Sequence, residues 1–300
     1  MKKGNTSTIE STVAQLDVVK KIEEKLFDTK LVRLHPNIEG FDSPESYGVY
    51  KTDGGSALGV VGRTFSPINS KRLLESLVSG LIENEIPLDK LKHATMKGDS
   101  KLLFSVPIKT MSFTNAAGIV DPTVLKLNVQ SGYDGWTSTS LFITAWREIC
   151  SNGMKGNVTE FKSTFKNVKG NVGKIEALTE DIVKVIAEAD NYEVLLNKFN
   201  KTEISDFQVN NFIERVFGMK KKEYVLWSRR KQNTWDAINR SVGLEIERTG
   251  KTLWGVLNGV THYTNHVAST GNRTDYLLVD SGEYFNSRAQ KFATAMADKN

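Results

Sequence analysis

The stretch of residues 132–155, GYDGWTSTSLFITAWREICSNGMK, constrains the fold more than any other part of the chain. It opens on Asp134-Gly135, a pair typical of tight turns because glycine accepts the positive φ that such turns need. A Ser/Thr cluster follows, and apolar residues then recur every three or four positions, at Leu141, Phe142, Ala145, Trp146, Ile149 and Cys150. This spacing predicts a buried helix that the Ser/Thr cluster caps and Gly153 ends.

Composition places the chain among ordinary soluble globular proteins, with 39% hydrophobic and 25% charged residues in 300. We expect no membrane span, because no run of eighteen apolar residues occurs, and no signal peptide, because the N-terminal residues lack an apolar block. The single cysteine excludes an internal disulfide and favours a reducing, cytoplasmic compartment. A net charge of +5 permits an anionic partner without requiring one.

The first half of the chain alternates between helix and strand patterns. A capping box at Ser7–Glu10 predicts a helix to about Thr29, with a buried stripe of Val13, Leu16, Val19, Ile22 and Leu26. Residues 47–65 read as a hairpin around Asp53-Gly54-Gly55, and Asn69 or Ser70 can cap the helix that follows. Strands are expected at 101–113, where Pro107 favours an edge or a bulge, and at 123–133, paired antiparallel.

The second half of the chain is mainly helical in pattern. Helices are expected from Leu178 onward, from a capping box at Ser205–Gln208 to Gly218, over about 220–240, and over 252–270. We therefore predict an α+β fold, in which packed helices cover a small antiparallel sheet with a β-β-β-α-like core. The predicted segments are an α+β core (1–154), a mainly helical Lys-rich region (155–250) and a C-terminal helical segment that packs back on the core (251–300).

Two basic stretches are candidates for binding an anionic polymer. Residues 155–174 are rich in lysine, and residues 220–235, KKKEYVLWSRRKQNTW, place six cations beside Tyr224, Trp227 and Trp235. Cations neutralise phosphates and aromatic faces stack on bases, which is the composition of a single-strand-binding surface. The alternative is a solvated helix whose tryptophans face the core and whose lysines face water.

Arg147 likewise has two interpretations. Its guanidinium could bind a phosphate with two parallel hydrogen bonds, or it could pair with a carboxylate at the edge of the predicted helix. If the first interpretation holds here and in both basic stretches, the nucleic-acid-binding residues are Arg147, Lys162, Lys166, Lys169, Lys220, Lys221, Lys222, Tyr224, Arg229, Arg230 and Lys231.

No motif for catalysis is visible. Phosphate-loop and dinucleotide fingerprints are absent, and Cys150 stands among apolar residues with no histidine nearby in the sequence. His262 and His266 have a spacing that can bind zinc, but without a cysteine partner or an H-E-x-x-H pattern they are better explained as polar or packing residues. We expect a protein that is not an enzyme and that needs no cofactor or metal.

Three segments resemble a known family, the phage- and plasmid-like proteins grouped as domain of unknown function 932. Residues 58–77 are similar to its G-x-V-G-x-x-Y-x-P-x-Q-N segment, with Phe65 in place of Tyr and Ile68 in place of Gln. Residues 133–154 resemble H-D-G-S…R-x-x-C-x-N-T-L, with Tyr133 in place of His and Gly153-Met154 in place of Thr-Leu. Residues 252–266 resemble T-x-W-x-x-x-N-A-V-T-x-Y-x-D-H, with Gly259 in place of Ala and Asn265 in place of Asp.

The resemblance covers about residues 45–295 and implies a protein carried by phages, prophages or plasmids in the cytoplasm of a bacterial host. A more distant likeness links its β-β-β-α core to phage single-strand annealing proteins, which bind DNA along a basic groove. The first hypothesis is therefore single-stranded DNA binding in recombination or replication, by a protein that could form a homo-oligomer. The alternative is a non-enzymatic structural or interaction protein of the phage with no nucleic-acid role.

Overall fold

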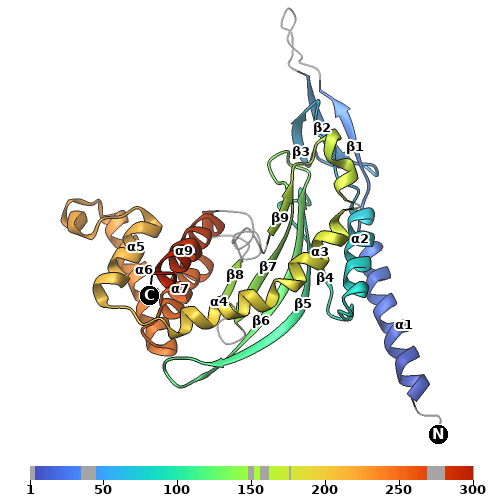
Figure 1. The fold of residues 1–300 in the computed structure, drawn as a ribbon. Helices are drawn as coiled ribbons and strands as arrows, with labels where there is room; N and C mark the ends of the chain where they lie inside the picture. The colour runs from blue at the N-terminus through green and yellow to red at the C-terminus, as the bar shows by residue number, and fades with distance from the viewer. Residues whose placement is uncertain are drawn as a thin grey trace, which may run out of the picture. The chain divides into compact units, whose positions relative to one another are not determined.

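The computed structural model describes residues 4–34, 45–147, 152–155, 162–175, 177–268 and 281–299. The fold is α+β, as predicted, and divides into two compact units that interleave along the chain (Figure 1). Unit 1 comprises residues 1–108, 127–142 and 162–187, and unit 2 comprises residues 109–126, 143–161 and 188–300. Within these ranges, every helix is either too short or too polar to span a lipid bilayer.

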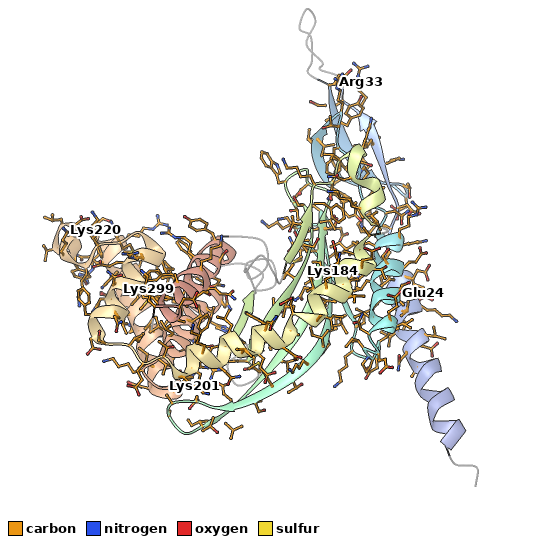
Figure 2. All side chains as sticks on the ribbon, in the orientation of Figure 1. Glu24, Arg33, Lys184, Lys201, Lys220 and Lys299 are labelled. Atoms are coloured by element: carbon orange, nitrogen blue, oxygen red, sulfur yellow. The ribbon has the colours of Figure 1, made fainter. Side chains whose placement is uncertain are left out.

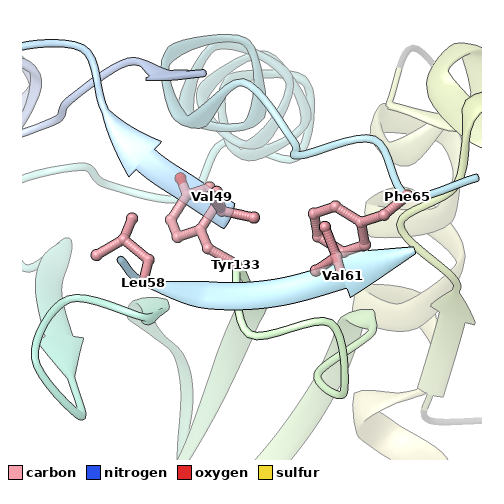
Figure 3. Packing of buried hydrophobic residues seen from close by; sticks show 5 residues of the cluster. All are labelled: Val49, Leu58, Val61, Phe65 and Tyr133. Carbon is pink, nitrogen blue, oxygen red and sulfur yellow. The ribbon is translucent and has the colours of Figure 1, made fainter. Parts of the chain in front are cut away.

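Unit 1 contains a three-stranded antiparallel sheet in the order β1 (Thr29–Arg33), β2 (Ser46–Lys51) and β3 (Gly59–Gly62). The predicted hairpin is confirmed: β2 pairs with β3, and the turn between them uses positive φ angles at Gly54 and Gly55. Beneath the sheet, Val49, Leu58, Val61, Phe65 and Tyr133 form one buried cluster, in which they point toward one another (Figure 3). Burial raises the pKa of the Tyr133 hydroxyl to about 12.

The α-helices among the described residues of unit 1 are α1 (Gly4–Glu23), α2 (Ser70–Glu83) and α3 (Leu178–Ala187). Asn69 caps α2 as predicted, because its side chain accepts hydrogen bonds from the backbone N–H groups of Lys71 and Arg72. The prediction for α1 was wrong in three respects. The helix begins at Gly4, so Ser7 lies inside it, and it ends at Glu23, whereas the expected end near Thr29 is the start of β1. Leu16 of the expected buried stripe is 52% exposed.

The larger sheet has the order β4 (Lys92–Met96), β5 (Lys101–Thr114), β6 (Val120–Gly132), β7 (Thr139–Arg147) and β8 (Asn152–Lys155). β9 (Lys162–Phe165) pairs with the first half of β7, and β8 pairs with its second half. Strands β5, β6 and β7 contribute residues to both units. β4 pairs with β5 as far as Ser105, so Pro107 lies beyond that pairing, but β5 lies between β4 and β6 and is not an edge strand of the sheet.

The predicted helix after the Asp134-Gly135 turn was wrong, because residues 139–147 form strand β7. Eight of its nine residues are buried, so the strand is covered on both faces. A strand buried on both faces reads as a nearly continuous apolar run, in which helical spacing occurs by chance. Its content of Thr, Ile, Phe and Trp favours a strand. Gly153 lies within β8 and ends no helix, and Cys150 falls outside the described residues.

Unit 2 is mainly helical, with α4 (Ala189–Lys201), α5 (Asp206–Phe217), α6 (Arg229–Thr249), α7 (Leu253–His262), the π-helical turn η4 (Tyr263–Val267) and α9 (Ser281–Ala297). The predicted capping box of α5 is confirmed, since Ser205 and Gln208 bond reciprocally, and Gly218 ends the helix at a φ of 67°. The expected continuous helix over 220–240 was wrong. A 3-10 helix, η3 (Lys221–Leu226), precedes α6, and Ser228 caps α6 after the break.

Candidate nucleic-acid interface

The second basic stretch forms an exposed surface of unit 2 because buried residues anchor it. Met219 is buried just before it, and Trp227 and Trp235 are buried within it, so that most of the residues between these anchors lie on the outside. Lys221 is further held by its backbone N–H, which donates to Glu214 Oε1 at 2.8 Å. We call the six cations of this stretch the basic surface: Lys220, Lys221, Lys222, Arg229, Arg230 and Lys231. All are exposed except Lys231, which is half-buried.

The aromatic rings of this stretch face inward. Trp227 and Trp235 are 9% and 4% exposed, and their rings pack edge-on at 5.6 Å between centroids. The ammonium of Lys231 lies 4.5 Å from the Trp227 ring centroid. Tyr224 is half-buried and donates its hydroxyl hydrogen to Asp236, a hydrogen bond that raises the pKa of the phenol. The tryptophans therefore match the alternative interpretation, in which they face the core, and they offer no stacking surface here.

Three of the six cations occupy the first turn of α6, where the positive end of the helix dipole repels them. Arg229, Arg230 and Lys231 directly follow the capping residue Ser228, and no acidic residue shares that turn. The N-terminal end of a helix carries partial positive charge and backbone N–H groups without intrahelical acceptors. Cations at this position reduce helix stability, typically by a few tenths of a kcal/mol each, unless an anion offsets them. The local arrangement is thus suited to an anionic ligand.

The other predicted lysines lie elsewhere in the chain and in the other unit. Lys166 and Lys169 belong to unit 1 and are exposed, on either side of the buried Asn167. Lys162 is in β9, but its side chain falls outside the described ones. The predicted lysines whose side chains are described therefore fall in both units, Lys166 and Lys169 in unit 1 and Lys220, Lys221, Lys222 and Lys231 in unit 2.

Arg147 is not a surface residue, and its phosphate-binding interpretation was wrong. It is 2% exposed, and its Nε and Nη1 donate to Asp121 Oδ1 at 2.8 Å and Glu245 Oε2 at 2.7 Å. Both carboxylates are fully buried, so the carboxylate-pairing alternative holds, inside the core. A buried charge is tolerated only with such partners, and no polymer can reach it.

Sequence reasoning missed the rest of the network around Arg147. The indole N–H of Trp254 donates to Asp121 Oδ2 at 3.1 Å, and Arg248 lies 3.4 Å from Glu245 Oε1. These links join β6, β7, α6 and α7 within unit 2, across 133 residues of sequence in the longest case. The only signal was indirect: Arg147 and Trp254 both stand in the segments that resemble the known family.

In the described part of the chain, no group of three or more His, Cys, Asp or Glu side chains is arranged to hold a metal ion. His262 and His266 have ring centroids 5.2 Å apart, and partial burial lowers the pKa of His262. Asn258 Oδ1 and Asn265 Nδ2 are buried in the same unit without a hydrogen-bond partner. The two asparagines are buried in α7 and η4, whereas the two histidines are only half-buried.

Comparison with known families accounts for most of the chain, although comparisons with curated proteins and with solved structures returned no match. The family model described as "Domain of unknown function (DUF932)" matches residues 57–297. That range includes all three segments whose motifs carried the resemblance, and it includes every candidate residue considered above. The chain therefore belongs to the DUF932 family.

Proposed function

We propose that this protein binds single-stranded DNA without sequence specificity, through the basic surface of unit 2, and that it assists recombination or replication in a phage- or plasmid-bearing bacterial cell. The proposal requires no chemical step, only the neutralisation of phosphates. The observation that carries it is the group of exposed cations at η3 and at the first turn of α6.

The chemistry of these cations favours a phosphate chain over water alone. A phosphate near Arg229 and Arg230 would interact with two guanidinium groups, and the partial charge of the helix end would attract it as well. Arginine forks match phosphate oxygens with parallel hydrogen bonds, and Lys220 and Lys222 add mobile point charges beside them. Because the nearby tryptophans are buried, binding at this surface should depend on charge and not on base identity.

A second candidate function is protein–protein interaction without nucleic acid. Val225 and Leu226, in the middle of the same stretch, are 81% and 82% exposed. Exposed apolar side chains next to cations also suit an acidic protein partner. The two functions differ in one prediction: the protein should bind short oligonucleotides if it is a DNA-binding protein, and should not bind them if it only contacts other proteins.

The test is binding of a fluorescent single-stranded oligonucleotide, followed by anisotropy, across a salt series. If about five phosphates are neutralised, affinity should fall roughly 100-fold between 50 and 200 mM salt. Reversing three exposed cations, in a variant carrying Lys222→Glu, Arg229→Glu and Arg230→Glu, should weaken binding and reduce the slope of log K against log salt by about 2.

A control variant separates local from overall charge. Lys201, Lys291 and Lys299 are exposed cations of the same unit, and their reversal changes the net charge equally. In the view of Figure 2, Lys220 lies near the top of unit 2 and Lys201 near its bottom. The control should bind almost as tightly as the wild type. Equal losses in both variants, or negligible binding by the wild type at low salt, would contradict the proposal.

A further inference from the structure

Trp136 is the most exposed of the large apolar side chains in the described part of the chain, at 91%. It lies in unit 1, on the turn between β6 and β7. Tryptophan is usually largely buried, because exposing its ring to water costs free energy. Both faces of an indole this exposed are open to a flat ligand.

The turn that carries Trp136 is rigid. Asp134 Oδ1 accepts hydrogen bonds from the backbone N–H groups of Trp136 at 3.0 Å and Thr137 at 2.8 Å, and Asp134 Oδ2 accepts the Thr137 hydroxyl hydrogen. Gly135 has a φ of 79°, and a Cβ there would lie 2.9 Å from a methyl group of Val61. The backbone is therefore fixed before any ligand arrives, which lowers the entropy lost on binding.

Cations flank this turn. The side-chain amide of Asn167 donates to the Thr137 carbonyl at 3.2 Å, which brings the exposed Lys166 and Lys169 to the same end of unit 1. The backbone N–H of Lys169 donates to the Thr64 carbonyl at 3.0 Å, next to Arg63. A groove of about 670 Å³ opens there, lined by Glu45, Tyr47, Arg63, Thr64, Val168, Lys169 and Gly170.

The charge of the groove is only partly balanced inside the protein. Arg63 lies 3.6 Å from Glu45, but their side chains are 74% and 46% exposed. An exposed pair of this kind is weak, so the guanidinium of Arg63 remains able to bind a phosphate.

We infer that Trp136 stacks on an unpaired base of a single-stranded nucleic acid, while Arg63 and Lys169 hold neighbouring phosphates in the groove. This inference rests on the proposed function and adds a second contact surface to it, in unit 1. A single strand suits the site, because bases within a duplex are already stacked on both faces. The flanking cations favour a nucleic acid over an apolar protein segment.

The experiment compares Trp136→Ala and Trp136→Phe with Phe207→Ala, using the same oligonucleotide assay on the full chain. Phe207 is a matched control, because it is an aromatic residue that is 78% exposed and belongs to the other unit. Loss of one stacked base should weaken binding about 5- to 150-fold in Trp136→Ala, with an unchanged salt slope since no charge is removed. Trp136→Phe should restore most of the affinity, and Phe207→Ala should bind as the wild type does.

A second readout is tryptophan fluorescence. Oligonucleotide binding should quench the wild-type emission, and most of that quenching should disappear in Trp136→Phe. If the wild type binds and Trp136→Ala binds equally well, the inference is overturned while the proposed function stands. If Trp136→Ala changes only the sedimentation of the free protein, Trp136 is a contact between copies, which also overturns it. If the wild type binds no oligonucleotide at any salt concentration, both fail together.

Discussion

Replacing Arg147 by methionine should destabilise unit 2 strongly. The guanidinium is the hydrogen-bonding partner of two fully buried carboxylates, those of Asp121 and Glu245. Methionine fills most of the volume but leaves both carboxylates without their main counter-charge. Breaking a buried ion pair by removing one partner costs about 3–5 kcal/mol.

Although two carboxylates lose their partner, we expect the cost of one broken ion pair and not of two. Asp121 keeps its hydrogen bond from the Trp254 indole, and Glu245 keeps Arg248 at 3.4 Å, so neither carboxylate is left without any partner. We expect a loss of about 3–5 kcal/mol in the free energy of unfolding. Arg147→Lys should lose less, because it keeps the charge but cannot bond to both carboxylates with one rigid fork.

The assay is urea unfolding followed by tryptophan emission, in which Trp254 reports on the network directly. The shift in midpoint multiplied by the m value gives the change in free energy. A triple variant with Arg147→Met, Asp121→Asn and Glu245→Gln removes all three charges, and it should regain a large part of the loss. The reasoning is refuted if Arg147→Met costs less than about 1 kcal/mol, or if the triple variant is less stable than Arg147→Met.

Two further predictions concern packing and pH. Gly259→Ala should cost about 1–3 kcal/mol, because its Cβ would lie 2.4 Å from the Cα of Val242 where α7 meets α6. By contrast, Gly243→Ala meets nothing within 4 Å and should be neutral or stabilising by up to about 1 kcal/mol; thermal melts of the pair that show equal shifts would contradict this. Burial, with a smaller contribution from Lys25, lowers the pKa of His93 in the folded protein. His93 therefore contributes stability at pH values above its unfolded-state pKa of about 6.5, and this contribution is lost as the pH falls through the lower folded-state pKa. Melting temperature should therefore drop from pH 7.5 to 5, and less so in His93→Phe, which keeps the ring contact with Phe104; an unchanged pH dependence in that variant would rule out His93 as the cause.

Local features of the chain were predictable because they depend on residues close in sequence. The capping box of Ser205 and Gln208, the left-handed stop at Gly218 and the Gly54-Gly55 turn each involve neighbours whose backbone geometry follows from side-chain type. Strand β7 was not predictable in this way. Its apolar residues fit a helical period, and only burial on both faces, which depends on distant parts of the chain, makes it a strand.

The candidate site shows the same division. The amino-acid order alone places six cations within twelve residues, and their exposure follows from the high cost of burying unpaired charge. The roles of Arg147, Trp227 and Trp136 were decided by tertiary structure: the first meets carboxylates 26 and 98 residues away, the second packs inward, and the third stands in water on a rigid turn. Which side chains remain accessible to a ligand depends on contacts between residues far apart in sequence, and those contacts form only when the chain folds.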